Sequence, residues 1–343
     1  MKERKLAKVF YADLWGLRDE KHEYLFKNDV STTQWQELQP VAPYYFFVPK
    51  DFALWGEYEE FWKVTEIFKK WSSGIKTHRD HFVVGFTKEE IVQRLRIFTG
   101  SLSDDLVKEA LKLKDTGTWK LSETRKELRG VKLEDRIYPY AYRPFDVRWI
   151  CYETLLIDRD RWPFMKHLLK KNLALCLKRS RYIKTTLFHH VFVSAFISDV
   201  NFFGDQTWFF PLYLYPSEPE GRLFGEGEAE IERIPNFTAE FLQAAKESLG
   251  IEPTPEQLFY YIYAVLYSPT YRRRYEEFLK IDFPRIPLPA QYDAFMKLSR
   301  LGKELVDLHL LKHPVLEETG IGFPESGSNK VEKVCYNEET QRV

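Results

Sequence analysis

One loop, residues 74–80, combines a glycine with side chains that can donate hydrogen bonds or carry charge, in the order Gly-Ile-Lys-Thr-His-Arg-Asp. A phosphate-binding P-loop needs several glycines and a Gly-Lys-Ser/Thr step, so that successive backbone N–H groups can surround a phosphate. Here Ile75 separates the single glycine from the lysine, and this spacing rules out a P-loop. Two interpretations stay open. The loop is either a polar connection between a helix and a strand or a set of phosphate donors, namely Lys76, Thr77, His78 and Arg79.

No other familiar catalytic or metal-binding pattern occurs in the sequence. It has no G-x-G-x-x-G after a strand, no G-x-S-x-G and no H-E-x-x-H. The histidine pairs lack thiolate partners and a nearby acidic triad, which favours hydrogen-bonded or solvated histidines over metal ligands. These pairs are His78 and His81, His189 and His190, and His309 and His313. We therefore predict neither a catalytic residue nor a metal site.

Positively charged side chains recur near aromatic residues, several of them in turns or at the ends of expected strands. Arginine binds phosphate bidentately and can read guanine O6 and N7, while aromatic rings stack on exposed bases or belong to the core. Besides the loop, the candidates for nucleic-acid contact are Arg143, Arg148, Arg159, Arg161, Lys178, Arg179, Arg181 and Arg274. Arg274 is included because it has no evident partner on its own expected helix. The alternative is solvated charge on the surface of a globular domain.

Composition limits the function classes. Lys plus Arg is 51 and Asp plus Glu is 51, so the net charge of zero argues against a strongly basic, non-specific nucleic-acid binder but permits a local basic groove. The three cysteines are widely separated, and the charged N-terminus lacks the apolar core of a signal peptide. No apolar run approaches the length of a membrane span. We therefore expect a cytoplasmic protein without a membrane partner.

The spacing of apolar residues predicts the helices and strands on either side of the loop. Residues 57–71 repeat apolar side chains at helical spacing, and the apolar run 44–49 predicts a strand that ends at a proline. After the loop, residues 81–86 predict a short strand. Thr87 and Glu90 then form a T-x-x-E capping box, which predicts the start of a helix.

The rest of the chain changes from strands to helices. Residues 137–215 consist mostly of short β-branched and aromatic runs separated by turns. The glutamate-rich stretch 217–233 predicts a linker, and Thr254 begins a capping box that starts a helix. A further helix over 290–311 is expected to bury Phe295, Leu298, Leu301, Leu305 and Leu308.

We therefore predict an α+β fold, with a mixed β-rich middle region, flanking helices and a helical C-terminal subdomain. The expected divisions are 1–49, the β-rich region 50–216, the linker 217–233, the helical subdomain 234–315 and a polar tail 316–343.

Over nearly the whole chain, a series of motifs in a fixed order resembles the sequences of one known family. The motifs are FYADLWGLRDEK, APYYFFVPKD, GIKTHRDHFVV, YAYRPFDVRWICY, HVFVSAFISD, FPLYLYP, IPNFT, YYIYAVLYSPTYRRRYEEFLKIDFPRIPLP and VEKVCY. In this order they resemble the C-terminal specificity, or target-recognition, domain of type ISP restriction–modification enzymes and of Eco57I-like N6-adenine DNA methyltransferases.

The resemblance implies a partner and a division of labour. It implies that the chain binds double-stranded DNA for an N6-adenine methyltransferase and endonuclease, with residues 1–49 as the end of the methyltransferase domain. S-adenosylmethionine, Mg and ATP are then expected only for the parent enzyme, because this chain has no N-P-P-[YF] motif, glycine-rich cofactor loop or Walker motif. Two alternatives stay open: a protein-interaction module that docks on a separate methyltransferase or motor subunit, and a nuclease with a non-obvious site.

Overall fold

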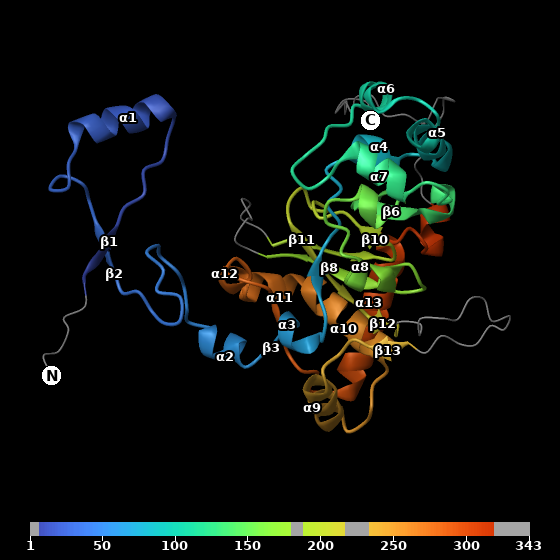
Figure 1. The fold of residues 1–343 in the computed structure, drawn as a ribbon. Coiled ribbons are helices and arrows are strands. Elements are labelled where there is room, and N and C mark those ends of the chain that lie inside the picture. The colour runs from blue at the N-terminus through green and yellow to red at the C-terminus, as the bar shows by residue number, and fades with distance from the viewer. Residues whose placement is uncertain (1–6, 180–187, 217–232, 319–343) are drawn as a thin grey trace, which may run out of the picture.

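A computed structural model describes residues 7–179, 188–216 and 233–318 (Figure 1). Within these residues the chain forms five small sheets and a series of mostly short helices, so the predicted α+β class is confirmed. The expected linker and polar tail lie almost entirely outside the described residues. The predicted domain limits stay a prediction.

The first segment lies apart from the rest of the chain in Figure 1. Its strands β1 (Val9–Tyr11) and β2 (Gln36–Leu38) pair antiparallel, with helix α1 (Arg18–Lys27) between them. The strand predicted over 44–49 is wrong. These residues form turns, and Tyr45 has φ 47°, which no strand contains. A continuous apolar run is typical of a strand that is buried on both faces, and no residue of 7–50 is buried.

The helix predicted over 57–71 is also wrong as a single element. The chain forms α2 (Trp55–Glu59), β3 (Trp62–Lys63), α3 (Val64–Ile67) and β4 (Ser72–Ser73) instead. The reason is a tertiary contact with strand β14 (Arg285–Ile286), which pairs with β3. The Arg285 guanidinium donates to the carbonyls of Glu59 and Phe61, which a continuing helix would need for itself.

One four-stranded sheet has the order β10 (Ile197–Ser198), β6 (Ile137–Arg143), β7 (Asp146–Cys151), β5 (Val84–Gly85). Only β10 and β6 run parallel. The strand predicted over 81–86 is therefore shorter, because α4 (Asp80–Val83) takes its first half. The helices between Lys88 and Leu168 are α5 (Lys88–Thr99), α6 (Asp104–Leu111), α7 (Leu121–Glu127), η1 (Leu133–Arg136), η2 (Thr154–Leu156), α8 (Trp162–Met165) and η3 (Lys166–Leu168).

The predicted start of α5 is confirmed, with one difference. Thr87 accepts from the Glu90 N–H at 3.3 Å, as an N-cap does. The Glu90 carboxylate accepts from the N–H of Phe86 at 3.0 Å rather than from that of Thr87.

A second, antiparallel sheet has the order β4, β11 (Thr207–Pro211), β8 (Ala174–Lys178), β9 (Val191–Ser194). Beside it, β12 (Tyr213–Leu214) pairs with β13 (Ile234–Pro235). The strands expected between 137 and 215 are thus confirmed.

The C-terminal part is helical, as predicted. Its helices are α9 (Ala239–Leu249), α10 (Pro255–Tyr267), α11 (Pro269–Arg274), α12 (Glu276–Leu279), α13 (Tyr292–His309) and η5 (Pro314–Glu318). Thr254 and Gln257 form the predicted capping box of α10. On α13, however, Leu301 is exposed, because the helix turns Gly302 and Val306 toward α10.

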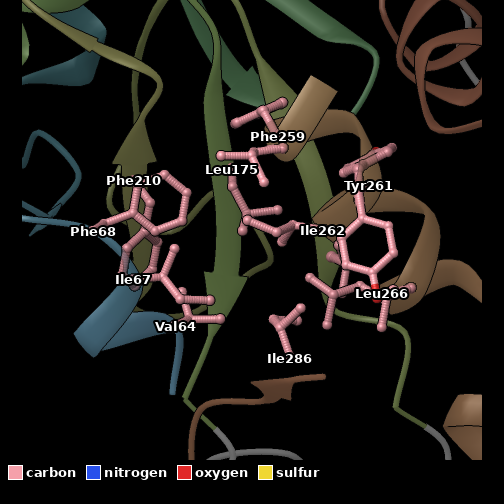
Figure 2. Packing of buried hydrophobic residues seen from close by; sticks show 14 of the residues in the cluster. Val64, Ile67, Phe68, Leu175, Phe210, Phe259, Tyr261, Ile262, Leu266 and Ile286 are labelled. Atoms are coloured by element: carbon pink, nitrogen blue, oxygen red, sulfur yellow. The ribbon is translucent and has the colours of Figure 1, made fainter. Parts of the chain in front are cut away.

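Two apolar clusters share the second sheet. Figure 2 shows the first, where Leu175 and Phe210 of the sheet meet side chains from α3, α10 and β14. Cys176 and Phe209, the next residues on the same strands, belong to the cluster around the other sheet. Because neighbouring strand residues face opposite ways, the second sheet is buried on both faces and joins the two halves of the body.

Candidate nucleic-acid interface

Loop 74–80 is fastened to two other segments through its backbone. Lys76 and Arg159 exchange two N–H···O bonds of 3.1 and 2.9 Å, and Ile75 forms a parallel bridge with Asp199. A Cβ atom at position 74 would lie 2.5 Å from the Asp199 backbone. Gly74 is therefore required for close backbone approach, and the loop is held beside the turn 158–161.

Two of the predicted donors point inward. Thr77, 1% exposed, bonds to Asp80 and accepts from the Arg79 N–H at 3.0 Å. Arg79, 8% exposed, donates to the Thr77 carbonyl at 3.1 Å, and its guanidinium lies 4.2 Å from the centre of the Trp119 ring. Burial lowers the pKa of Arg79. These two side chains hold the shape of the loop rather than facing solvent.

The outer side of the loop borders a cavity of about 200 Å³, which we call the basic pocket. Its charged and imidazole side chains are His78, Arg79, His81, Lys112, Lys114 and Asp158. His78 Nδ1 lies 3.4 Å from an Asp158 carboxylate oxygen. His78 and Lys112 adopt φ of 56° and 51°, a left-handed conformation that costs free energy in residues other than glycine and is enriched at functional sites.

Lys112 and Lys114 were not among the candidates predicted from the sequence. They follow α6, far along the chain from the loop, and only the folded structure brings them beside His78. The pattern that could have indicated them is the run Lys112-Leu113-Lys114, directly after an amphipathic helix.

Arg148 and Arg143 meet around one tyrosine. The guanidinium of Arg148 lies 3.9 Å from the ring centre of Tyr142 and 4.5 Å from that of Phe86, and that of Arg143 lies 4.1 Å from Tyr142. We call these four residues the arginine–aromatic stack. The Tyr142 hydroxyl donates to Asp80 at 2.9 Å, so the stack is tied to loop 74–80.

Carboxylates fix both arginines of the stack. Arg148 donates from Nε and Nη2 to the two Asp146 oxygens at 2.8–3.1 Å. Arg143 donates to Asp199 at 2.9 Å, and Asp199 also accepts from the Tyr140 hydroxyl at 2.8 Å. Burial raises the pKa of Asp199, and the hydrogen bonds and Arg143 oppose this rise. Arg143 is thus committed to a buried partner.

Arg159 and Arg161 occupy the turn beside the loop. The Arg159 side chain is 60% exposed, and its nearest carboxylate, Asp158, is 3.7 Å away. Arg161 has φ 57° and precedes α8. Its Nε is buried and has no hydrogen-bond partner among the described residues.

The remaining candidates that the structure describes are paired with acids. Lys178 is 3.5 Å from Asp205, and Arg179 bonds bidentately to Asp282 at 2.7 and 3.4 Å. Arg274, left without a partner by the sequence, bonds bidentately to Glu57 of α2 at 3.2 and 2.5 Å. Those hydrogen bonds raise its pKa. Arg181 lies outside the described residues.

The described ranges contain no group of three or more His, Cys, Asp or Glu residues that could hold a metal ion. Nor does any helix in them have the length and apolar character needed to cross a membrane.

A family model described as the Type ISP C-terminal specificity domain matches residues 66–343. Comparison with curated proteins gave no match. Among solved structures, a cryoEM structure of a DrdV–DNA complex is similar, with a TM-score of 0.64 and 23% identity over 85% of this chain and 29% of that one.

Two further solved structures are similar. A nuclease-deletion mutant of the Type ISP restriction-modification enzyme LlaGI, in complex with a DNA substrate mimic, gives a TM-score of 0.60 at 22% identity, over 90% of this chain and 24% of that chain. The ATP-dependent Type ISP restriction-modification enzyme LlaBIII bound to DNA gives a TM-score of 0.55 at 22% identity, over 80% of this chain and 18% of that chain. The chain thus spans less than a third of the length of each of these proteins, and the likeness shows a shared fold.

Proposed function

The chain belongs to the Type ISP C-terminal specificity domain family, and from this premise we propose that it is a DNA target-recognition module that binds duplex DNA through loop 74–80 and its neighbours. The observation that carries the proposal is that cations from several separate segments of the chain come together. The loop, the turn 158–161, the residues after α6 and the end of the β6–β7 hairpin bring their cations to one region through the basic pocket and the arginine–aromatic stack. The DNA-bound states of DrdV, LlaGI and LlaBIII are consistent with it.

The cations of this region divide into two kinds. The exposed groups His78, Lys112, Lys114 and Arg159, and the half-buried Lys76, suit phosphate contacts, which set position on the duplex without reading sequence. The fixed arginines of the stack suit contacts that need defined geometry. A protein of zero net charge binds DNA in this way through a local patch, while acidic groups elsewhere limit non-specific binding.

We propose that catalysis and its cofactors belong to other parts of a parent enzyme, in the cytoplasm, and that S-adenosylmethionine, Mg and ATP act there. A methyltransferase domain or subunit is the proposed protein partner. Residues 7–50 support this partner, because they expose large apolar side chains, with Trp15 82% and Phe26 89% exposed. Exposed apolar surface of this kind marks sites of protein contact.

The test is binding of the full chain to a labelled duplex of random sequence, followed by fluorescence anisotropy across a salt titration. We expect log K to fall linearly with log salt, with a slope that reports the number of phosphates contacted. Arg159→Ala should make the slope shallower by about 1 and weaken all sequences alike.

Arg274→Ala is the matched control, because it removes one arginine from a different surface, paired with Glu57. It should leave both affinity and slope unchanged. If Arg159→Ala keeps the wild-type slope and Arg274→Ala loses affinity, the DNA interface lies on the surface that carries Arg274 instead. Absence of duplex binding at every salt concentration would reject the proposal.

A second candidate function is a protein-interaction module, which the exposed apolar surface of residues 7–50 favours. Gel filtration separates it from DNA recognition. Self-association that persists at high salt and is unaffected by duplex DNA supports the interaction module. A monomer that shifts only when DNA is added supports DNA recognition.

A further inference from the structure

Arg148 is held more rigidly than a phosphate contact requires. Rings cover its guanidinium, with Tyr142 at 3.9 Å and Phe86 at 4.5 Å. Asp146 accepts from Nε and Nη2. Three elements thus determine its orientation, since Phe86 precedes α5, Tyr142 lies on β6 and Asp146 begins β7.

The backbone delivers these groups through two irregularities. In the β6–β7 ladder, Ala141 opposes Val147 and Arg143 opposes Asp146, so Tyr142 is an extra residue on β6. Such a bulge redirects a side chain and is frequent beside functional sites. The turn that follows contains Phe145 at φ 62°, again left-handed.

One edge of the guanidinium stays free. Nε and the adjacent Nη2 hydrogen face Asp146, whereas Nη1 makes no hydrogen bond to any described residue. The Arg148 side chain is 24% exposed. Nη1 and the outer hydrogen of Nη2 therefore form a pair of donors, side by side, at the surface of the proposed interface.

We propose that Arg148 reads a guanine in the major groove, with Nη1 and Nη2 donating to O6 and N7, and that Asp146, Tyr142 and Phe86 are its positioning residues. This rests on the proposed function, since it needs a bound duplex. Guanine is the base that presents two acceptors side by side on its major-groove edge. Adenine presents N7 beside an amino donor, which meets a guanidinium with like polarity.

Arg148 differs from the neighbouring arginines in ways that suit reading a base rather than holding a phosphate. Arg159 is exposed and loosely placed, which suits a phosphate that can be approached from many directions. Arg143 uses Nη1 for both of its hydrogen bonds, to the buried Asp199 and to the Tyr142 carbonyl. Arg148 combines a plane fixed through Nε and Nη2 on Asp146 with an Nη1 that makes no hydrogen bond to a described residue.

The experiment selects duplexes bound by the full chain from a randomised library and sequences them. We expect a motif that includes at least one required guanine. Replacement of that guanine by 7-deazaguanine removes N7 and should weaken binding by the wild type about tenfold or more. If no guanine of the motif is sensitive to 7-deazaguanine, the proposal is overturned without any variant.

Variants then assign the guanine. With Arg148→Ala the motif should lose preference at that one position, and 7-deazaguanine there should no longer matter. Asp146→Asn keeps the arginine but weakens its support, so it should relax the same position to a smaller extent. Arg159→Ala is the matched control and should keep the whole motif while lowering affinity for every sequence.

Each result has a defined meaning. If Arg148→Ala melts at the wild-type temperature and lowers affinity evenly with the motif unchanged, Arg148 is a phosphate contact and the proposal fails. If Arg148→Ala unfolds, the 7-deazaguanine result and Asp146→Asn still decide. If wild-type protein binds no duplex, the proposed function fails before this question arises.

Discussion

At the scale of single residues, burial separates side chains that the sequence presents as equivalent. Thr77 and Arg79 lie between Lys76 and Asp80 in one polar run, yet they turn inward. The cause is the backbone pairing of Lys76 with Arg159, which fixes the direction of the loop, and the Trp119 ring that receives Arg79. A polar run therefore contains both side chains that face solvent and the contacts that shape the loop.

Burial of one histidine outside the loop predicts that stability depends on pH. His167 is 4% exposed, and its Nδ1 accepts from the Tyr215 N–H at 3.0 Å. Burial, followed by the charges of Lys166 and Lys70, lowers the pKa of His167 to about 4. In the unfolded chain its ordinary pKa is 6.5. The unfolded state therefore binds the proton more readily between these values, and stability falls as pH falls through that window.

We predict that His167→Gln reduces the pH dependence of the free energy of unfolding. The wild type should lose about 2 kcal/mol through this residue between about pH 7.5 and about pH 5. Urea denaturation at the two pH values measures the difference. The control is His22→Gln, which changes an exposed histidine of α1 and should leave the pH dependence as it is. If His167→Gln keeps the full loss, His167 is protonated without cost in the folded state.

At the scale of elements, the sequence predicted correctly those helices and strands that contacts between nearby residues determine. The capping box of Thr254 and the strands of residues 137–215 could be predicted because caps and alternating runs act over a few residues. The helix over 57–71 could not, because Arg285, more than two hundred residues later, takes the carbonyls that would continue it. Of the basic pocket, only His78 and Arg79 were among the candidates predicted from the sequence, since Lys112 and Lys114 reach it only by folding.

The packing of α13 on α10 shows the same limit. Leucine spacing predicted a buried face that included Leu301, but the structure buries Gly302 and exposes Leu301. A Cβ atom on Gly302 would lie 1.9 Å from the Tyr260 carbonyl oxygen of α10. Without a side chain at this position the two helices can approach, and the face that packs is the one with the smallest residue.

We predict that Gly302→Ala destabilises the protein, although alanine favours helix by about 1 kcal/mol over glycine. The clash is with backbone, so the helices must separate, and the net loss should be about 2 kcal/mol or more. Chemical denaturation measures it. Gly117→Ala is the matched control, because a Cβ atom there meets nothing within 4 Å. Equal stability of the two variants would show that α10 and α13 have room to adjust.

At the scale of the whole molecule, the second sheet makes the body one unit. Phe209 and Phe210 are neighbours on β11, but one belongs to each apolar cluster. Loss of either cluster exposes one face of the same sheet, so the two halves support each other. The segment 7–50 has no such role, because none of its residues is buried and its strands pair only with each other.

We therefore predict that deletion of residues 1–40 leaves the body folded, with a melting temperature within about 2 °C of the full chain, since almost no buried apolar contact is lost. The cut leaves the ion pair of Lys50 with Glu277 in place. Calorimetry measures the melting temperature, and the DNA-binding slope should be unchanged because loop 74–80 and Arg148 lie within the body. If the full chain self-associates at high salt, the deletion should reduce this, since it removes Trp15 and Phe26. A clearly lower melting temperature would mean that this segment packs on the body in solution, and loss of DNA binding would extend the interface to it.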